Sequence, residues 1–355
     1  MSTHCPRILI VRLSAIGDCL HGLPVLCALR DALPSAHLSW VVEGRTADLL
    51  RRHPALDAVV QVPRKWLKSP RAVWRARRQL RGLRPDVAID LQGLTKSAIA
   101  AWLSGAPTRI GFSGRDGREV STWLNNSLVE PMMTHVIDRN LELLRPLDVA
   151  RDEVRFGLPS FDNDDTAIDR FLRDRGLSAG FALLNVGAGW PSKRWPADRF
   201  AEVARYLGER YHLRSVIAWA GDEERRWADQ IVVAAGGFAH MGPQTTLTEL
   251  AALCHRAKFF VGCDTGPLHL AVAMGTPCIG LYGPTSARRN GPYGDRQIAL
   301  QRARLADNTR KSLRIGDNAS MLVISVEDVC SACDAMMERF HADQAPRRCF
   351  ERLAA

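Results

Sequence analysis

The sequence has no apolar run long enough to cross a membrane or to act as a signal peptide. Its first apolar segment, residues 8–11, is interrupted at once by Arg12 and then by Asp18. A secretory signal needs an apolar segment of about 7–15 residues, and a membrane span needs about 20. Low-complexity tracts are also lacking, and 46% hydrophobic with 24% charged residues is ordinary for a folded protein. We therefore expect a folded chain in the cytoplasm.

A disulfide framework is not expected either. The chain has nine cysteines, and several of them lie in apolar segments: Cys19, Cys27, Cys254, Cys263 and Cys278. An odd count argues against complete pairing, so reduced thiols are the simpler interpretation. Cys330 and Cys333 have the spacing of metal ligands, with Cys349 beyond them, but a second such pair is missing and the surrounding pattern is helical. We expect structural thiols there.

Acidic residues are absent from residues 58–85, in a chain of net charge +10. The basic residues of this stretch are Arg64, Lys65, Lys68, Arg71, Arg75, Arg77, Arg78, Arg81 and Arg84. Such a run attracts nucleic acid, an anionic membrane or an acidic glycolipid. No recognisable DNA-reading module accompanies it, so we expect no nucleic acid. Trp66 and Trp74 lie within the run and favour peripheral contact of residues 64–84 with an anionic membrane, a solvated helix face being the alternative.

Apolar segments of strand length alternate with helical patterns, which predicts an α/β fold with mostly parallel sheets. In the first half the expected strands are residues 7–13, 38–43, 58–62, 86–91 and 108–112. A helix is expected over residues 20–33, because Pro34 disfavours helix in the residue before it. The second half repeats the cycle with strands at residues 181–186, 215–220, 258–263 and 277–282.

The length of 355 residues exceeds that of most single cores, so two domains are expected. Residues 153–165 are richer in Asp, Pro and Gly and form the predicted linker. We expect Rossmann-like domains over residues 1–160 and 161–330 that face each other across a cleft, with ligands outside the carboxyl ends of the strands. The helical segment 331–355 is expected to return to the first domain.

Residues 262–285, GCDTGPLHLAVAMGTPCIGLYGPT, carry the strongest functional signal. A buried strand ends at Asp264, Thr265 and Gly266, and a helix of small residues follows. Glycine lets a ligand approach the backbone, and a helix N-terminus offers N–H groups and its positive dipole end to phosphate. We expect Thr265 and Gly266 to contact a diphosphate. His269, about one turn further, is expected to face the same anion, the alternative being a helix histidine satisfied by the protein.

Five motifs in this order resemble those of glycosyltransferase family 9, the ADP-heptose heptosyltransferases. They are RILIVRLSAIGDCLHGLPVL, DLQGLTKSA, RIGF, PSKRWP and the segment 262–285, and they span nearly the entire chain. None contains the GxGxxG fingerprint, which weighs against a dehydrogenase. The resemblance implies a GT-B fold in which the first domain binds the acceptor and the second binds the nucleotide sugar. It also implies metal-independent transfer from ADP-heptose, with inversion at the anomeric carbon and no cofactor.

In the opening motif Gly17 permits a tight turn that brings Asp18 to the head of the next helix. Transfer of a sugar to a hydroxyl needs a base, and a carboxylate within hydrogen-bond reach can take the proton. The resemblance implies this role for Asp18, and Gly17 is grouped with the donor site. The alternative is an aspartate that stabilises the start of the helix.

The loop at Gly187 and the motif PSKRWP follow the first strand of the second domain. Lys193 is expected to reach the cleft and to offset the negative charge that builds on the departing diphosphate. Arg194 is a less favoured substitute, and a plain surface lysine is the alternative. The Asp-x-Asp pattern at residues 162–164 falls in the predicted linker rather than at a strand end, so we expect no metal site there.

Carboxylates that follow a Rossmann-type strand commonly bind ribose hydroxyls. Asp222, Glu223 and Glu224 follow one strand of the second domain. The spacing favours Glu224 over Glu223, with a solvated helix start as the alternative. In the first domain Asp90 ends a strand, where it either orients the acceptor or anchors the turn at Gly93.

Acceptor contacts are expected from Arg64, Lys65 and Arg118 of the basic first domain. These residues suit an acidic sugar such as Kdo and the phosphates of lipid A. The resulting hypothesis is a cytoplasmic enzyme, peripheral to the inner membrane, that extends a Kdo-lipid A or lipopolysaccharide-core acceptor. Three alternatives stay open: a family 9 transferase for another sugar or a protein acceptor, a sugar-nucleotide epimerase with the same paired domains, and a non-enzymatic nucleotide-binding module.

Overall fold

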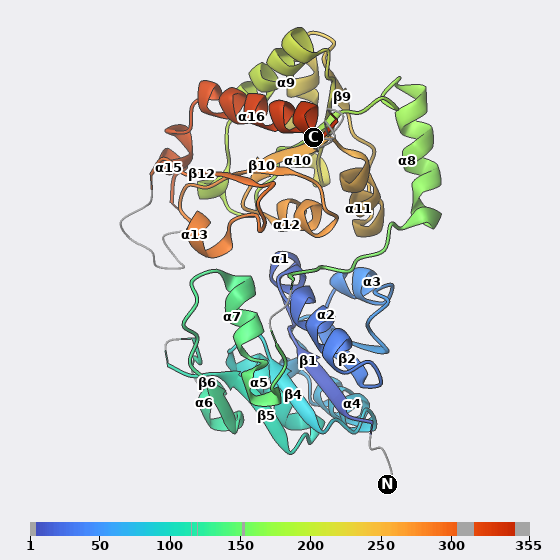
Figure 1. Cartoon of the computed structure of the whole chain (residues 1–355), viewed down its shortest axis with the longest axis vertical. Helices are drawn as coiled ribbons and strands as arrows, with labels where there is room; N and C mark the ends of the chain where they lie inside the picture. Colours follow the sequence, from blue (N-terminus) through green and yellow to red (C-terminus); the bar gives the residue numbers. More distant parts are fainter. Residues whose placement is uncertain (1–4, 115, 119, 151–152, 304–315, 345–355) are drawn as a thin grey trace, which may run out of the picture.

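The computed structural model shows two α/β units, each built on a six-stranded parallel sheet (Figure 1). It describes residues 5–114, 116–118, 120–150, 153–303 and 316–344. The strand order is β3-β2-β1-β4-β5-β6 in the first sheet and β9-β8-β7-β10-β11-β12 in the second, so the two topologies are the same. In this doubly wound order the winding reverses between β1 and β4, and again between β7 and β10. The predicted α/β class with two Rossmann-like halves is confirmed.

The first sheet is buried on both faces, as its apolar strands predict. Its strands are β1 (Arg7–Val11), β2 (His37–Glu43), β3 (Ala58–Val62), β4 (Val87–Asp90), β5 (Thr108–Phe112) and β6 (Ser127–Val129). Its helices are α1 (Ile16–Leu20), α2 (Leu23–Ala32), α3 (Thr46–Leu50), α4 (Pro70–Gly82), α5 (Thr95–Ser104), α6 (Ser121–Leu124) and α7 (Val136–Glu142). Along β1 the side chains alternate: Ile8 and Ile10 belong to the core under α2, α3 and α7, whereas Leu9 and Val11 belong to the core under α4 and α5.

The second sheet is covered by helices in the same way. Its strands are β7 (Ala182–Asn185), β8 (Ser215–Ala218), β9 (Ala239–Met241), β10 (Phe259–Cys263), β11 (Cys278–Leu281) and β12 (Ile298–Leu300). Its helices are α8 (Asp162–Asp174), α9 (Ala197–Tyr211), α10 (Gly221–Ala234), α11 (Leu247–Arg256), α12 (Gly266–Ala273), α13 (Ala287–Asn290), α15 (Ala319–Leu322) and α16 (Val326–Gln344). The first sheet ends and the second begins on either side of residue 160, and α8 begins inside the predicted linker.

The helix expected over residues 20–33 is α2, which begins three residues later than predicted, and a separate short helix, α1, precedes it. α1 ends at Leu20, and α2 begins at Leu23 with Pro24 in its first turn. Proline has no N–H to donate, so it fits the first turn of a helix but not its interior, and the chain breaks between the two helices. The edge strands β6, β9 and β12 were not among the predicted strands, because three residues carry too little pattern to be recognised.

The C-terminal helix α16 packs on the second domain, which corrects the expectation that the segment 331–355 returns to the first. Cys333 and Met336 are buried in the core of the second sheet. Tyr206 of α9 donates a hydrogen bond to Asp334 at 2.7 Å. The apolar side of α16 is therefore covered by α9 and the strands beside it. The correction applies to α16 up to residue 344, because residues 345–355 lie outside the described part of the chain.

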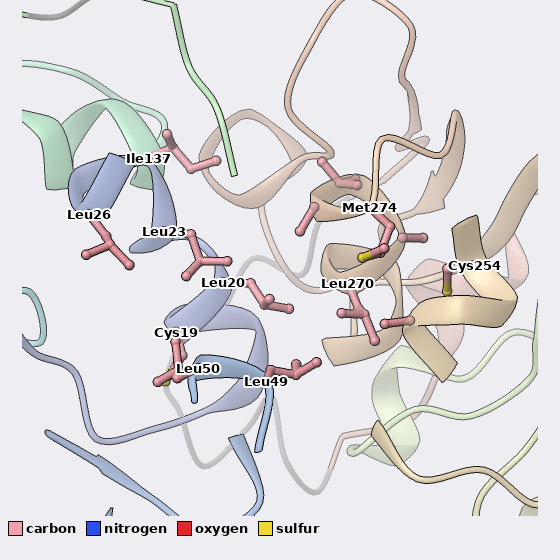
Figure 2. Close-up of a cluster of buried hydrophobic side chains, with 14 of the residues drawn as sticks. Cys19, Leu20, Leu23, Leu26, Leu49, Leu50, Ile137, Cys254, Leu270 and Met274 are labelled. Atoms are coloured by element: carbon pink, nitrogen blue, oxygen red, sulfur yellow. The ribbon is translucent and has the colours of Figure 1, made fainter. Parts of the chain in front are cut away.

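An apolar junction joins the two domains. Figure 2 shows Leu20 of α1 and Leu49 of α3 opposite Leu270 of α12 and Met274, which directly follows α12, with Cys254 of α11 beside them. All five side chains are buried in one continuous core cluster. Because apolar side chains from both domains exclude water here, α1 is held directly against α12.

Candidate active site

The main predicted site residues follow strands next to the two points where the winding reverses. Asp18 lies in α1 after β1, Lys193 ends the short 3₁₀ helix η3 (Pro191–Lys193) after β7, and Asp264 directly follows β10. At such a point the connecting helices leave toward opposite faces, so the strand ends open a crevice in which ligands bind. The first-domain and second-domain parts of the site meet because α1 packs on α12.

Asp264 holds three other side chains of the second domain in place. Its Oδ2 atom accepts hydrogen bonds from Lys193 Nζ at 2.6 Å and from Thr285 Oγ1 at 2.7 Å. Its Oδ1 atom lies 3.1 Å from His269 Nε2. The Lys193 and Asp264 side chains are 15% and 6% exposed, so this ion pair is largely removed from water.

The surroundings of Asp264 keep it ionised and orient Lys193. Burial alone would raise the pKa of Asp264, but the hydrogen bond to His269 and the charge of Lys193 outweigh it and hold that pKa well below its ordinary value. Lys193 also donates to the Asp264 carbonyl at 3.1 Å, and its Nζ lies 4.8 Å from the centre of the Trp190 ring. An ammonium has three N–H donors, and both hydrogen bonds found for this one go to Asp264. Lys193 is therefore a largely buried cation held in one position, rather than an unconstrained surface lysine.

A histidine pair bridges the domains between α1 and α12. His21 Nε2 lies 3.1 Å from His269 Nδ1, and both side chains are buried. Burial, together with the charges of His269 and His135, holds the pKa of His21 well below its ordinary value, so His21 is neutral at pH 7. Both ring nitrogens of His269 have protein partners, which favours the alternative of a helix histidine satisfied by the protein. The chain from His21 through His269 to Asp264 connects the first domain to the carboxylate that holds Lys193.

Two glycines allow the first turns of α1 and α12 to come together. A Cβ on Gly17 would lie 2.5 Å from His269 Cδ2, and a Cβ on Gly266 would lie 3.4 Å from Ile16 Cβ. The Thr265 hydroxyl does not cap α12 but donates to a backbone carbonyl of β10 at 3.1 Å. Because the first N–H groups of a helix have no partner within the helix, the first turn of α12 can donate to an anion beside α1.

Asp18 is an ionised carboxylate between the two domains. Its Oδ1 atom is 2.6 Å from Arg12 Nη2, and its Oδ2 atom accepts from the Ala15 N–H at 3.1 Å. Burial raises the pKa of Asp18, but the Arg12 guanidinium and the Ala15 N–H outweigh it and lower that pKa below its ordinary value. The charges of His269 and Arg289, both in the second domain, lower it further. The side chain remains 42% exposed, so an acceptor can reach it.

Arg12 and Arg289 are parts of the site to which the sequence reasoning assigned no role. Arg12 is only 8% exposed, its Nη1 donates to the Leu91 carbonyl, and its Nε has no hydrogen-bond partner among the described residues. The sequence feature that could have identified Arg12 as a site residue is its place directly after β1, six residues before Asp18. Arg289 comes from α13, far along the chain, and no local pattern connects it with the first domain.

Gly187, in the loop after β7, is in direct contact with Glu224, in the first turn of α10 after β8. A Cβ on Gly187 would lie 2.3 Å from Glu224 Oε1. Glu224 Oε2 accepts from the Ala220 N–H at 2.8 Å, and burial raises the pKa of Glu224. Glu223 instead forms an ion pair with Arg194 at 3.1 Å and is 55% exposed. Of the two candidates, Glu224 is therefore the one that faces the loop after β7.

Gly187→Ala is expected to weaken nucleotide binding, because the added methyl group would displace the Glu224 carboxylate. The loss of one hydrogen bond to a charged group corresponds to a drop of about tenfold in affinity. Gly189→Ala is the matched control in the same loop, since a Cβ there has no atom within 4 Å. Calorimetric titration with ADP measures both variants, and equal affinities would remove Glu224 from the nucleotide site.

The predicted acceptor residues lie at the carboxyl edge of the first sheet, on both sides of β1. Arg64, Lys65 and Arg118 are exposed. Arg64 follows β3, where its Nε would be 3.8 Å from a Cβ on Gly44. Arg118 follows β5, and its N–H donates to the Gly93 carbonyl at 3.0 Å. Since β3 and β5 are separated by β2, β1 and β4, these residues flank the Asp18 strand end and do not form one cluster.

The motif DLQGLTKSA builds the first-domain side of the site. Asp90 is fully buried and accepts from the Gly93 N–H at 3.1 Å, so the turn-anchoring alternative is confirmed for it. Lys96 Nζ lies 2.9 Å from Ser14 Oγ and 3.0 Å from Glu43 Oε2. Lys96 was not among the residues predicted for the site, although its place at the start of the helix after β4 puts it at the same edge of the sheet as Asp18.

Among the described residues, no group of three or more His, Cys, Asp or Glu side chains is arranged to hold a metal ion. Cys330 and Cys333 are buried in the second core, and burial raises the pKa of the Cys330 thiol to about 11. Cys349 and the side chains of residues 162–164 lie outside the described residues. The helices of the described part include none that is both long and apolar enough to span a membrane.

Comparison with known proteins gives a match over most of the chain. Residues 73–318 match the model of glycosyltransferase family 9 (heptosyltransferase). Lipopolysaccharide heptosyltransferase 1 of Pseudomonas aeruginosa is 30% identical over 305 residues, which cover 83% of this chain and 83% of that protein.

Two solved structures have a similar fold over nearly the full length. The glycosyl transferase family 9 protein from Veillonella parvula superposes with a TM-score of 0.82 at 24% identity, covering 96% of this chain and 99% of that one. The E. coli heptosyltransferase WaaC with ADP-2-deoxy-2-fluoro heptose superposes with a TM-score of 0.71 at 26% identity, covering 93% and 99%.

Proposed function

This chain belongs to glycosyltransferase family 9, the heptosyltransferases, and from that premise we propose that it transfers heptose from ADP-heptose to a lipid-linked acceptor. It is a glycosyltransferase with the GT-B fold. The proposed acceptor is Kdo-lipid A or the lipopolysaccharide core. The donor and acceptor are supported by a relative named lipopolysaccharide heptosyltransferase and by a similar E. coli enzyme that binds an ADP-heptose analogue.

One observation carries the proposal: an ionised first-domain carboxylate stands beside the first turn of a second-domain helix. Asp18 lies in α1, and the first turn of α12 approaches that helix so closely that a Cβ on Gly266 would touch Ile16. A helix N-terminus suits the diphosphate of a donor. A base beside that diphosphate is what a transfer between two bound molecules requires.

In the proposed reaction an acceptor hydroxyl attacks the anomeric carbon on the face opposite the diphosphate. Its oxygen forms the new bond to that carbon, the bond to the diphosphate oxygen breaks, and ADP leaves with the electron pair. Asp18 takes the proton of the hydroxyl. A single displacement of this kind inverts the anomeric carbon.

The leaving diphosphate is stabilised, in this proposal, by fixed charges and dipoles of the second domain instead of a metal ion. Lys193 supplies the positive charge, and the turn at Thr265 and Gly266 supplies N–H donors. Asp264 and His269 complete the donor site by holding Lys193 in position. Because Asp264 fixes the lysine before the donor arrives, little reorganisation is needed as the charge develops.

The remaining contacts of the proposal lie at the edges of the site. Glu224, packed on Gly187, is the proposed ribose contact. Arg64, Lys65 and Arg118 are the proposed contacts to the acidic acceptor, supported by their exposure beside the Asp18 strand end. The basic residues 64–84 are proposed to bring the enzyme to the cytoplasmic face of the inner membrane, where a lipid-linked acceptor lies.

Calorimetric titration with ADP, UDP, GDP and NAD in the presence of a chelator tests the donor. We expect ADP to bind at least about tenfold more tightly than the others, since the proposal uses an ADP-sugar. A preference for UDP or GDP would overturn the proposal of ADP-heptose as the donor, and a preference for NAD would contradict the proposal of a glycosyltransferase site.

Mass analysis of the products then separates transfer, which adds one heptose to the acceptor, from epimerisation, which changes the nucleotide sugar without any acceptor.

A further inference from the structure

Three neighbouring helices of the first domain each expose one tryptophan. Trp74 on α4 is 63% exposed, Trp102 on α5 is 54% exposed and Trp123 on α6 is 84% exposed. α4 packs beside α5, and α5 packs beside α6. Tryptophan is a large amphipathic side chain that usually finds cover in a folded protein, so its exposure on three adjacent helices is unusual.

The inward sides of these helices already have their packing partners. Ala76 and Leu80 of α4 and Ala100 and Ala101 of α5 are buried in the core beneath them. In the helix α4, Trp74 is on the side opposite Ala76 and Leu80, because successive residues are rotated by about 100°. The outward tryptophans are therefore not needed to hold these helices on the sheet.

Arginines share the outward side of α4 with Trp74. Arg71 lies three residues before Trp74, and Arg78 and Arg81 lie four and seven residues after it, which places them on the same side of the helix; all three are exposed. The Arg78 guanidinium lies 5.7 Å from the centre of the Trp74 ring. Arg81 lies against the C-terminal end of α5, where its Nε would be 3.6 Å from a Cβ on Gly105. The basic stripe of α4 thus continues toward the turn of α5 that carries Trp102.

The positive charge of residues 64–84 is not neutralised by ion pairs among the residues that the structure describes. All nine Lys and Arg residues between 64 and 84 are exposed. None of them forms an ion pair with an acidic residue in the described part of the chain. A symmetric contact with a second copy would bring two such runs together, and their repulsion disfavours that occupant.

We propose that the tryptophan face, made of Trp74, Trp102 and Trp123 with the basic stripe Arg71, Arg78 and Arg81, docks on an anionic phospholipid bilayer. The indole rings enter the headgroup layer, which is where tryptophan sits in membrane interfaces, and the guanidinium groups contact lipid phosphates. This inference rests on the proposed function, because a lipid-linked acceptor requires the enzyme at the membrane. It extends the proposed membrane contact from residues 64–84 to α5 and α6, and it assigns insertion into the headgroup layer to the three tryptophan side chains.

The full-length protein and its variants are tested for binding to vesicles of phosphatidylcholine with and without phosphatidylglycerol, some carrying brominated acyl chains. The parent protein should bind only the anionic vesicles, and brominated lipid should quench its tryptophan fluorescence. The variant W74A/W102A/W123A should bind about tenfold more weakly, and that quenching should be lost. The variant R71E/R78E/R81E should bind about a hundredfold more weakly.

Matched controls lie on the second domain. Val233→Ser removes an apolar side chain that is 82% exposed, and R170E/R173E/R205E reverses three exposed arginines. Both controls should bind vesicles like the parent. Parent-like vesicle binding by the tryptophan variant would overturn the proposal, as would binding of the parent to oligonucleotides while it ignores anionic vesicles.

An activity measurement separates this inference from the proposed function. With a water-soluble, delipidated acceptor the tryptophan variant should transfer sugar at the parent rate, whereas with acceptor in vesicles its rate should fall about tenfold. If the parent protein transfers no sugar to either acceptor, the proposed function fails. The vesicle binding and quenching data still decide the docking surface in that case.

Discussion

Asp18→Asn is expected to slow sugar transfer severely while nucleotide binding is retained. The amide keeps the size of the carboxylate but cannot take the proton of an acceptor hydroxyl. Loss of a positioned general base lowers kcat by about 10²–10⁴-fold. The hydrogen-bond and ion-pair partners found for Asp18 are Arg12 and Ala15, both in the first domain. The affinity for ADP should therefore stay within about twofold of the parent value.

The parent protein and the Asp18→Asn variant are compared by a transfer assay and an ADP titration on the same preparations. Asp48→Asn is a suitable control, because Asp48 lies in the same domain, is 57% exposed and forms a surface ion pair with Arg51. Parent-like turnover in the Asp18→Asn protein would remove Asp18 from the mechanism. Joint loss of transfer and of ADP binding would point instead to a displaced α1.

The pH profile adds a second test of the same residue. Burial raises the pKa of Asp18, but the Arg12 guanidinium and the Ala15 N–H lower it below its ordinary value, so the carboxylate is ionised at neutral pH. A carboxylate with a lowered pKa is a weak base, so the role proposed for Asp18 depends on its position beside the acceptor rather than on its basicity. A loss of activity between about pH 5 and 7 would have to come from another group.

The places of the site residues were predictable because each follows a recognisable strand. Asp18, Lys193 and Asp264 come after β1, β7 and β10, and the carboxyl ends of those strands are where a doubly wound sheet binds ligands. The short edge strands were not predictable, because a half-exposed segment of three residues resembles a loop. The break between α1 and α2 was missed because Pro24 was not read as the start of a new helix.

The pairing of side chains across the fold was not predictable from local pattern. Lys193 and Asp264 are separated by 71 positions and form a buried ion pair. His21 and His269 are separated by 248 positions and bridge the domains. Such contacts depend on how the helices after different strands meet, which periodicity and motif spacing do not encode.

The exposure of the tryptophans in the basic run, residues 64–84, was also not predictable from the sequence. Trp66 and Trp74 are equivalent in the sequence, and both favoured a membrane interface. In the structure Trp66 is 2% exposed and packs in the core under α4, whereas Trp74 is 63% exposed. A single tryptophan in a basic run is therefore ambiguous until the helix that carries it has been placed on the sheet.

Lys193→Ala is expected to impair both transfer and stability, since the lysine is the proposed countercharge of the leaving diphosphate and pairs with the buried Asp264. Removing one preorganised group that stabilises a developing negative charge lowers kcat by about 10²–10³-fold. Removing one partner of a buried ion pair leaves Asp264 with an uncompensated charge and lowers the free energy of unfolding by about 3 kcal/mol. Arg205→Ala, an exposed arginine on α9, is the control and should match the parent in both measurements.

The pH dependence of unfolding tells whether the stability effect of Lys193 is electrostatic. The pKa of Asp264 is held well below its unfolded value, so its contribution is fully present above about pH 4 and is lost as the pH falls through the folded pKa. Without Lys193 that depression is smaller, so the variant should lose less stability than the parent between pH 6 and about pH 3. Urea unfolding at the two pH values measures this, and the difference in the free energy of unfolding between the parent and the variant should be smaller in acid. A difference of constant size would mean that Lys193 stabilises the fold by packing, and the countercharge role would lose its support.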